Sequence, residues 1–179
     1  MRSVSRTTFI QIGEHGFWAL ADTFGAWMGY LVEEFADRAP VQLDPALSDL
    51  AQKWRVAAVV TDYGADAGDL CEAQRAALRS IAVAARARAE TIGDLSAEQM
   101  REWIILDGSP VAGGWAAGGT VELSRILEVA DGFIALLDNE LPPDPPTGAW
   151  LLGTGNGFQV MRYRPEALRG PRWSRHLPT

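Results

Sequence analysis

Apolar residues recur with helical spacing through the middle of this chain and alternate near its ends. The first helical stripe follows the i, i+3, i+4, i+7 pattern and consists of Phe24, Trp27, Met28, Leu31, Val32 and Phe35. Residues 7–12, TTFIQI, alternate instead and are rich in β-branched side chains, so they predict a strand that ends at Gly13. This change of period predicts a mainly helical α+β domain.

Start and stop signals divide the middle of the chain into about five helices. The predicted ranges are 17–37, a helix beginning at Asp44 and Pro45, 69–91, a short helix opening at Ser96 and containing Met100, Trp103 and Ile104, and a helix from Thr120 to about Leu141. Asp44 followed by Pro45 is an N-cap with proline at the first helical position. Ser96 with Gln99 resembles a capping box. The run VAAVV at 56–60 is compatible with a strand, but it continues the preceding stripe, which favours a helix.

The string GTGNGFQ, residues 153–159, has the composition of a glycine-rich phosphate cradle. A P-loop requires a lysine directly after its glycines, and Lys53, the single lysine of the chain, has no glycine loop before it. A dinucleotide-binding loop requires a helix after its last glycine, whereas FQVMRYR, which follows here, predicts a strand. The string therefore predicts a structural turn rather than a nucleotide site.

Asn-Gly favours a two-residue hairpin turn because both residues tolerate positive φ. A turn centred on Asn156 and Gly157 would pair Trp150 with Tyr163 across the two strands. We expect this hairpin to join the N-terminal strand in a small antiparallel sheet. The predicted globular domain spans residues 1–164, and residues 165–179 form an Arg/Pro-rich C-terminal tail.

The formal net charge of −7 is distributed unevenly. Residues 162–179 hold five arginines and one acidic residue, a net charge of +4, which leaves −11 on residues 1–161. An acidic body disfavours general nucleic-acid binding and favours a basic protein partner, although it would also serve solubility alone. The tail arginines Arg169, Arg172 and Arg175 are candidates for binding a partner, or for lying on the acidic body of their own domain. The near absence of lysine indicates a GC-rich, bacterial genome.

Few residues suggest covalent or metal chemistry. Cys71 is the only cysteine, which excludes an internal disulfide and a cysteine-rich zinc site. It belongs to an apolar helical stretch, so we expect a structural role rather than a nucleophile paired with His15 or His176. Ser109 lacks the second glycine of a nucleophile elbow. Carboxylate pairs such as Glu33 with Glu34 are expected on a solvated helix face. No cofactor or metal is predicted.

The sequence also predicts a cytoplasmic protein. Glu14 and His15 interrupt the first apolar stretch too early for a signal peptide. The longest uncharged run, residues 145–161, is rich in glycine and proline and is unsuited to a membrane helix.

The glycine-rich loop at 107–119 is the strongest ligand-binding candidate. Its residues proposed to bind a ligand or partner are Gly113, Gly114, Trp115, Gly118, Gly119 and Thr120. A helix that begins at Thr120 would offer free N–H groups to an anion, and Trp115 would cover a ligand or anchor a partner. The alternative places Trp115 in the core and leaves the glycines as a connection.

These features favour an acidic bacterial protein-interaction domain, of the kind that acts as an immunity protein or antitoxin by binding and neutralising another protein. Two alternatives stay open. One is an enzyme whose site is assembled from dispersed Asp, Glu and Arg residues, which would require these side chains to converge in a pocket. The other is a small-ligand sensor that uses the loop around Trp115.

Overall fold

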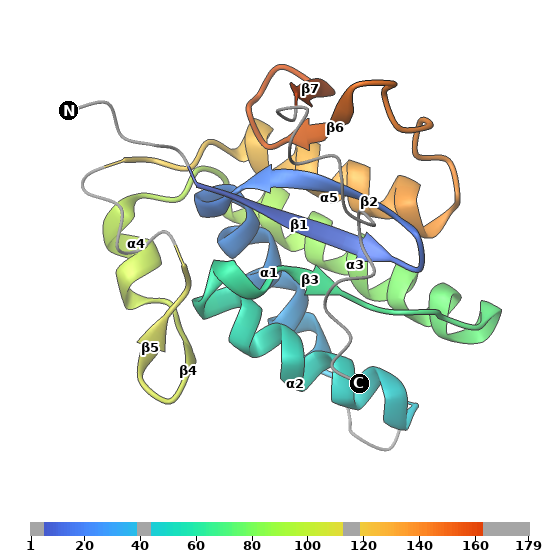
Figure 1. The fold of residues 1–179 in the computed structure, drawn as a ribbon. Coiled ribbons are helices and arrows are strands. Elements are labelled where there is room, and N and C mark those ends of the chain that lie inside the picture. Colours follow the sequence, from blue (N-terminus) through green and yellow to red (C-terminus); the bar gives the residue numbers. More distant parts are fainter. Residues whose placement is uncertain (1–5, 39–43, 113–118, 163–179) are drawn as a thin grey trace.

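The computed structural model describes residues 6–38, 44–112 and 119–162 (Figure 1). The described helices are α1 (Ala21–Ala36), α2 (Pro45–Val59), α3 (Glu72–Ile92), α4 (Ala97–Glu102) and α5 (Leu123–Leu137), with a 3₁₀ turn η2 (Thr61–Tyr63). The strands are β1 (Thr7–Ile12), β2 (His15–Leu20), β3 (Ala65–Asp66), β4 (Ile104–Leu106), β5 (Ser109–Pro110), β6 (Gly148–Leu152) and β7 (Gln159–Arg162). The fold is α+β and mainly helical, as the sequence predicts.

Five strands form one mixed sheet in the order β3-β1-β2-β6-β7. β1 and β2 are antiparallel and are joined at Gly13 and Glu14, where Gly13 has φ +58°. β3 pairs with β1 in parallel, β6 pairs with β2 in parallel, and β7 pairs with β6 in antiparallel fashion. The N-terminal segment and the C-terminal hairpin thus share a sheet, as predicted, but the sheet is mixed rather than purely antiparallel.

Helix α1 lies at the centre of the molecule. Eleven of its sixteen residues are buried, because it packs against α2, α3, α5 and the sheet. Its Trp27 ring contacts Phe133 of α5 edge-to-face with centroids 5.9 Å apart, and Phe133 contacts Trp54 of α2 at 5.8 Å. Such a helix, apolar on nearly every side, is typical of a core helix, and its aromatic cluster joins α1 to α2 and α5.

Helix α3 forms an outer layer behind α1 and α5 (Figure 1). Its buried residues are Leu78, Ile81, Ala82, Ala85 and Ala89, so small side chains let it approach the two inner helices. Its arginines pair with carboxylates of both: Arg86 with Asp131 of α5 at 2.6 Å, and Arg88 with Glu34 of α1 at 2.7 Å. None of the helices in the described ranges is long and apolar enough to cross a membrane.

Several predicted boundaries differ from the structure. Residues 17–20 were expected to begin a helix, but they belong to β2, and α1 starts only at Ala21. Ile104, assigned to the short helix, begins β4 after α4 ends at Glu102. Residues 109–110 of the predicted loop form β5, which pairs with β4. In each case pairing with another segment overrides a local pattern that is compatible with either state.

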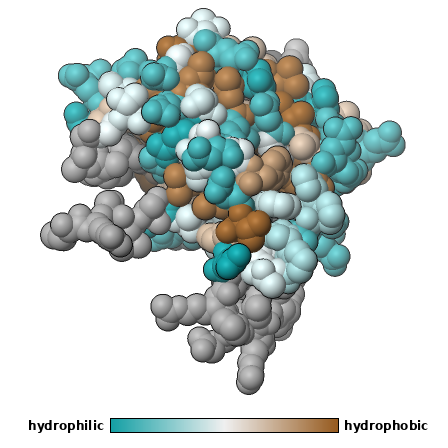
Figure 2. Space-filling model, turned by 90° about the horizontal axis from the view of Figure 1, so that it is seen from above, coloured by the Kyte–Doolittle hydropathy of each residue, from teal (hydrophilic) through white to brown (hydrophobic). Residues whose placement is uncertain are grey.

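The predicted C-terminal hairpin exists, but its register is wrong. β6 and β7 pair Trp150 with Val160 and Leu151 with Gln159, and a longer loop replaces the two-residue turn. Trp150 contacts Phe158 edge-to-face with ring centroids 5.4 Å apart, whereas Tyr163 lies outside the described residues. Seen from the side of β6, β7 and α5, hydrophilic residues alternate with small hydrophobic groups (Figure 2).

Candidate functional site

The glycine-rich loop lies mostly outside the described residues. Gly113, Gly114, Trp115 and Gly118 fall in this gap, while Gly119 and Thr120 are exposed. The prediction that Thr120 caps a helix is wrong, because α5 begins at Leu123 after Glu122. Ligand or partner binding by these six residues therefore stays a prediction.

The start of α5 already has an anionic partner. The Leu123 N–H donates to Asp94 Oδ1 at 2.7 Å. Directly before the helix, Val121 forms a two-way backbone bridge with Leu95, with N–O distances of 2.8 and 3.0 Å. This bridge moves the helix start three residues beyond Thr120.

The three arginines proposed as a partner-binding tail, Arg169, Arg172 and Arg175, also lie outside the described residues. Their role stays a prediction, as do the limits of the tail itself.

The hairpin loop GTGNG binds a carboxylate of the protein itself. Gly153, Gly155 and Gly157 have φ values of +82°, +82° and +71°, a left-handed conformation that favours glycine. The Gly155 N–H donates to Glu128 Oε2 of α5 at 2.6 Å. Burial raises the pKa of Glu128, while the backbone N–H groups of Gly155, Gly153 and Thr154 and the charge of Arg125 oppose this rise. The loop thus offers a backbone N–H group to a carboxylate, but that carboxylate is Glu128 of the same chain.

A second set of contacts fixes this loop to both inner helices. The Gly153 carbonyl oxygen accepts hydrogen bonds from Arg125 Nε at 2.8 Å and from Thr23 Oγ1 at 3.3 Å. The Nη2 atom of the same guanidinium pairs with the Asp22 carboxylate of α1, with a distance of 2.8 Å to Oδ1. These partners give the loop a structural role.

Three carboxylates surround one arginine. Arg88 pairs with Glu33 at 3.2 Å, with Glu34 at 2.7 Å and with Asp37. Glu34 has only 13% of its side chain exposed, so the expected solvated face is wrong for this residue. Beside it, burial and the charge of Glu33 raise the pKa of Tyr30 to about 12, against the opposing charge of Arg88. Such a group stays protonated at neutral pH and cannot act as a general base there.

Cys71, His15 and Ser109 do not form a catalytic unit within the described part of the chain. Cys71 lies at the edge of the apolar helical stretch, directly before α3, and it is exposed rather than buried as expected. Its backbone N–H donates to Gln74 Oε1 at 3.1 Å. Ser109 belongs to β5, and no hydrogen bond joins any two of these three residues in the described ranges.

Four exposed acidic residues lie on two chain segments that are hydrogen-bonded to each other, and we call Glu14, Asp66, Asp69 and Glu72 the acidic edge. The β1–β2 turn and the segment after β3 are held together by a Gly13 N–Gly68 O hydrogen bond of 2.9 Å. A Cβ placed on Gly13 would lie 3.1 Å from Asp69 Oδ1, so this carboxylate contacts the turn that carries Glu14. Within residues 6–38, 44–112 and 119–162, none of the four carboxylates forms an ion pair.

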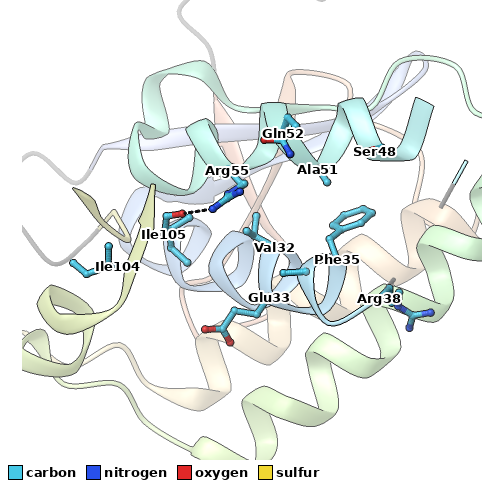
Figure 3. Close-up of a pocket in the computed structure, with 11 residues that line it drawn as sticks. Val32, Glu33, Phe35, Arg38, Ser48, Ala51, Gln52, Arg55, Ile104 and Ile105 are labelled. Atoms are coloured by element: carbon cyan, nitrogen blue, oxygen red, sulfur yellow. Dashed lines mark hydrogen bonds between the residues drawn. The ribbon is translucent and has the colours of Figure 1, made fainter. Parts of the chain in front are cut away.

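A groove of about 310 Å³ lies between α1 and α2 and is bordered by β4 (Figure 3). We call it the α1–α2 groove; the lining side chains that matter below are Val32, Phe35, Ala51, Ile105, Arg38 and Arg55. Val32, Phe35 and Ile105 are almost fully buried and form an apolar floor. Arg55 and Arg38 lie at opposite ends of the groove (Figure 3).

Sequence reasoning did not single out this groove. A signal was available on α2, where Ser48, Ala51, Gln52 and Arg55 follow the i, i+3, i+4, i+7 spacing and share one face. That face has one large charged residue among small and polar ones, which is unusual for either a core or a solvated face. Its partners from α1 and β4 could not be identified without the tertiary structure.

Comparison with protein-family models, curated proteins and solved structures finds no match for this chain. Function is therefore inferred from the residues and their arrangement.

Proposed function

We propose that this chain is a protein-binding domain that recognises a basic partner through its acidic edge, in the manner of an immunity protein or antitoxin. The observation that carries the proposal is that two hydrogen-bonded chain segments carry four exposed carboxylates, Glu14, Asp66, Asp69 and Glu72, none of which forms an ion pair among the described residues. Like charges held close together destabilise a fold, because they repel one another more in the folded state than in the extended chain.

The distribution of arginines supports the same proposal. Arg79, Arg86, Arg88 and Arg125 are each paired with carboxylates of neighbouring helices. These four basic side chains are thus engaged by carboxylates of the helical layers, while the acidic edge forms no ion pair among the described residues. A surface potential of this sign raises the association rate of a positively charged protein and disfavours acidic competitors.

The single thiol of the chain allows a direct test. Cys71 is exposed and is the direct neighbour of Glu72. A photoactivatable benzophenone attached to Cys71 should therefore cross-link a basic protein from the native host when that protein docks on the acidic edge.

A matched pair of variants separates docking from general charge. The first, E14Q/D66N/D69N/E72Q, removes the four charges of the edge. The control, D49N/E98Q/E102Q/D107N, removes four other exposed charges and leaves the same net charge. We expect the wild type and the control to give the same cross-linked partner, weakened at high salt, and the edge variant to lose it. Equal cross-linking by both variants, or no cross-link with the wild type, would refute the proposal and leave solubility as the role of the charge.

A further inference from the structure

We infer that the α1–α2 groove is a binding site for a small organic carboxylate with an apolar body. The carboxylate would pair with Arg55, and the apolar body would lie on Val32, Phe35 and Ala51. This site is separate from the acidic edge and does not depend on the function proposed above.

The two arginines of the groove differ from the paired arginines of α3 and α5. Arg55 donates from one terminal nitrogen to the Ile105 carbonyl oxygen at 3.1 Å, and Arg38 donates to the Ser80 carbonyl oxygen at 3.4 Å. The Nε atoms of both are buried and have no hydrogen-bond partner among the described residues. Neither forms an ion pair there, although the chain has a surplus of carboxylates.

A guanidinium that is partly buried and lacks an anion has lost hydration without a full replacement. A carboxylate is the group that best satisfies its planar donors. The segment that adjoins Arg38, residues 39–43, contains no ionisable side chain, and Glu166 is the only carboxyl side chain outside the described residues. The sequence itself therefore offers few alternative partners.

The one acidic residue of the lining does not cancel this positive charge. Glu33 points away from α2 (Figure 3). Its carboxylate accepts from Trp103 Nε1 at 2.6 Å and from Arg88 at 3.2 Å. The Glu33 carboxylate is therefore held by Trp103 and Arg88, which leaves the Arg55 and Arg38 guanidinium groups of the groove without an ion-pair partner among the described residues.

Size and charge together limit the ligand class. A groove of about 310 Å³ is at the lower end of the range for small-molecule sites, and it corresponds to about ten water volumes of roughly 30 Å³ each. An acidic protein partner would be repelled by the net charge of the body, whereas a monoanion carries only one charge into that field. The buried floor favours an aliphatic or aromatic body over a sugar or a nucleotide.

Three probes separate the contributions. Octanoate has both the charge and the apolar body, 1-octanol has the body alone, and acetate has the charge alone. Binding is measured by isothermal titration calorimetry and by amide chemical shifts of the full-length chain. We expect octanoate to shift amides of α1 and α2 at the groove and to bind at least tenfold more tightly than either of the other probes.

Two variants, each of which replaces one basic residue by methionine, complete the test. R55M keeps the apolar stem and removes the charge at the groove, and K53M removes one charge from the exposed side of the same helix. We expect R55M to weaken octanoate binding at least tenfold, with a small loss of thermal stability from the missing hydrogen bond to Ile105, and K53M to bind as the wild type does. Binding of octanoate that is equal in R55M, a 1-octanol affinity equal to that of octanoate, or no shift at the groove with any probe would each overturn the inference.

Discussion

Gly25 lies where α1 touches the backbone of another segment, and its replacement by alanine tests how tightly these layers pack. A Cβ at this position would lie 2.9 Å from the carbonyl carbon of Ala112 and still closer to its oxygen. Ala112 cannot move freely, because its N–H donates to the Ala58 carbonyl oxygen at 2.6 Å. The backbone would have to move by about 1 Å to restore an ordinary contact distance.

Two opposing terms determine the effect of G25A. Alanine in a helix interior is favoured over glycine by about 1 kcal/mol. Overpacking costs about 1–3 kcal/mol, and a clash with fixed backbone belongs at the upper end of that range. We therefore expect the free energy of unfolding to fall by about 2 kcal/mol. In a domain of this size that loss lowers Tm by about 4–8 °C.

The matched control is G132A in α5. Its added Cβ would meet the Cδ1 atom of Leu152, the end of a flexible side chain, and would lie 3.4 Å from Phe17 Cζ. The same helix gain then offsets a smaller steric cost, so we expect a change near zero. Urea denaturation followed by tryptophan fluorescence measures both variants. A G25A protein as stable as the wild type, or one no less stable than G132A, would refute this view of the interface.

Three further predictions concern charges. The pKa of Glu128 is raised in the folded state, so ionisation of this carboxyl destabilises the fold. Relative to E128Q, the wild type should therefore lose stability as the pH rises from about 4 through that raised pKa. Denaturation curves at successive pH values will measure this loss. R88M should lower the free energy of unfolding by about 2 kcal/mol, between the values for exposed and buried pairs, whereas R86M, whose partners are more exposed, should cost less than about 1 kcal/mol in the same urea assay. D94A removes the acceptor of the Leu123 N–H, so thermal unfolding should show a loss of about 1 kcal/mol.

The starts of α2 and α4 were predicted correctly because their signals are local. Asp44 caps α2 through a 2.8 Å bond from the Ala46 N–H, with Pro45 at the first helical position. Ser96 and Gln99 form the predicted capping box at the start of α4. Both motifs need only three or four consecutive residues, so they can be identified without the tertiary structure.

Strand assignments failed where pairing depends on distant residues. The apolar run from Phe17 to Leu20 is compatible with a helix or a strand, and β1 and β6 decide in favour of a strand by pairing with it on both sides. The hairpin register shifted because the loop is fixed by Glu128 and Arg125 of α5, not by its own turn preference. Tertiary contacts of this kind leave no trace in a local pattern.

The sequence predicted the charge of the acidic edge, but it did not predict where either candidate site lies in the fold. The acidic surplus was evident from the sequence, but the meeting of Glu14 with Asp69 depends on the short strand β3, which lies in a stretch that predicts only a break. The α1–α2 groove depends on β4, which brings Ile105 to Arg55. The β4–β5 hairpin itself was not predicted, since Ile104 was assigned to a helix and residues 109–110 to a loop.

The parallel pairing of β2 with β6 also affects how the chain folds while it is being synthesised. Trp18 pairs with Leu151, so β2 leaves the ribosome long before its partner does. At about 5–20 residues per second, the interval is on the order of 10 s. During this time one side of β2 is an unpaired edge, the kind of surface that recruits strands from other chains. The last fifth of the polypeptide thus closes a sheet edge that the first twenty residues opened.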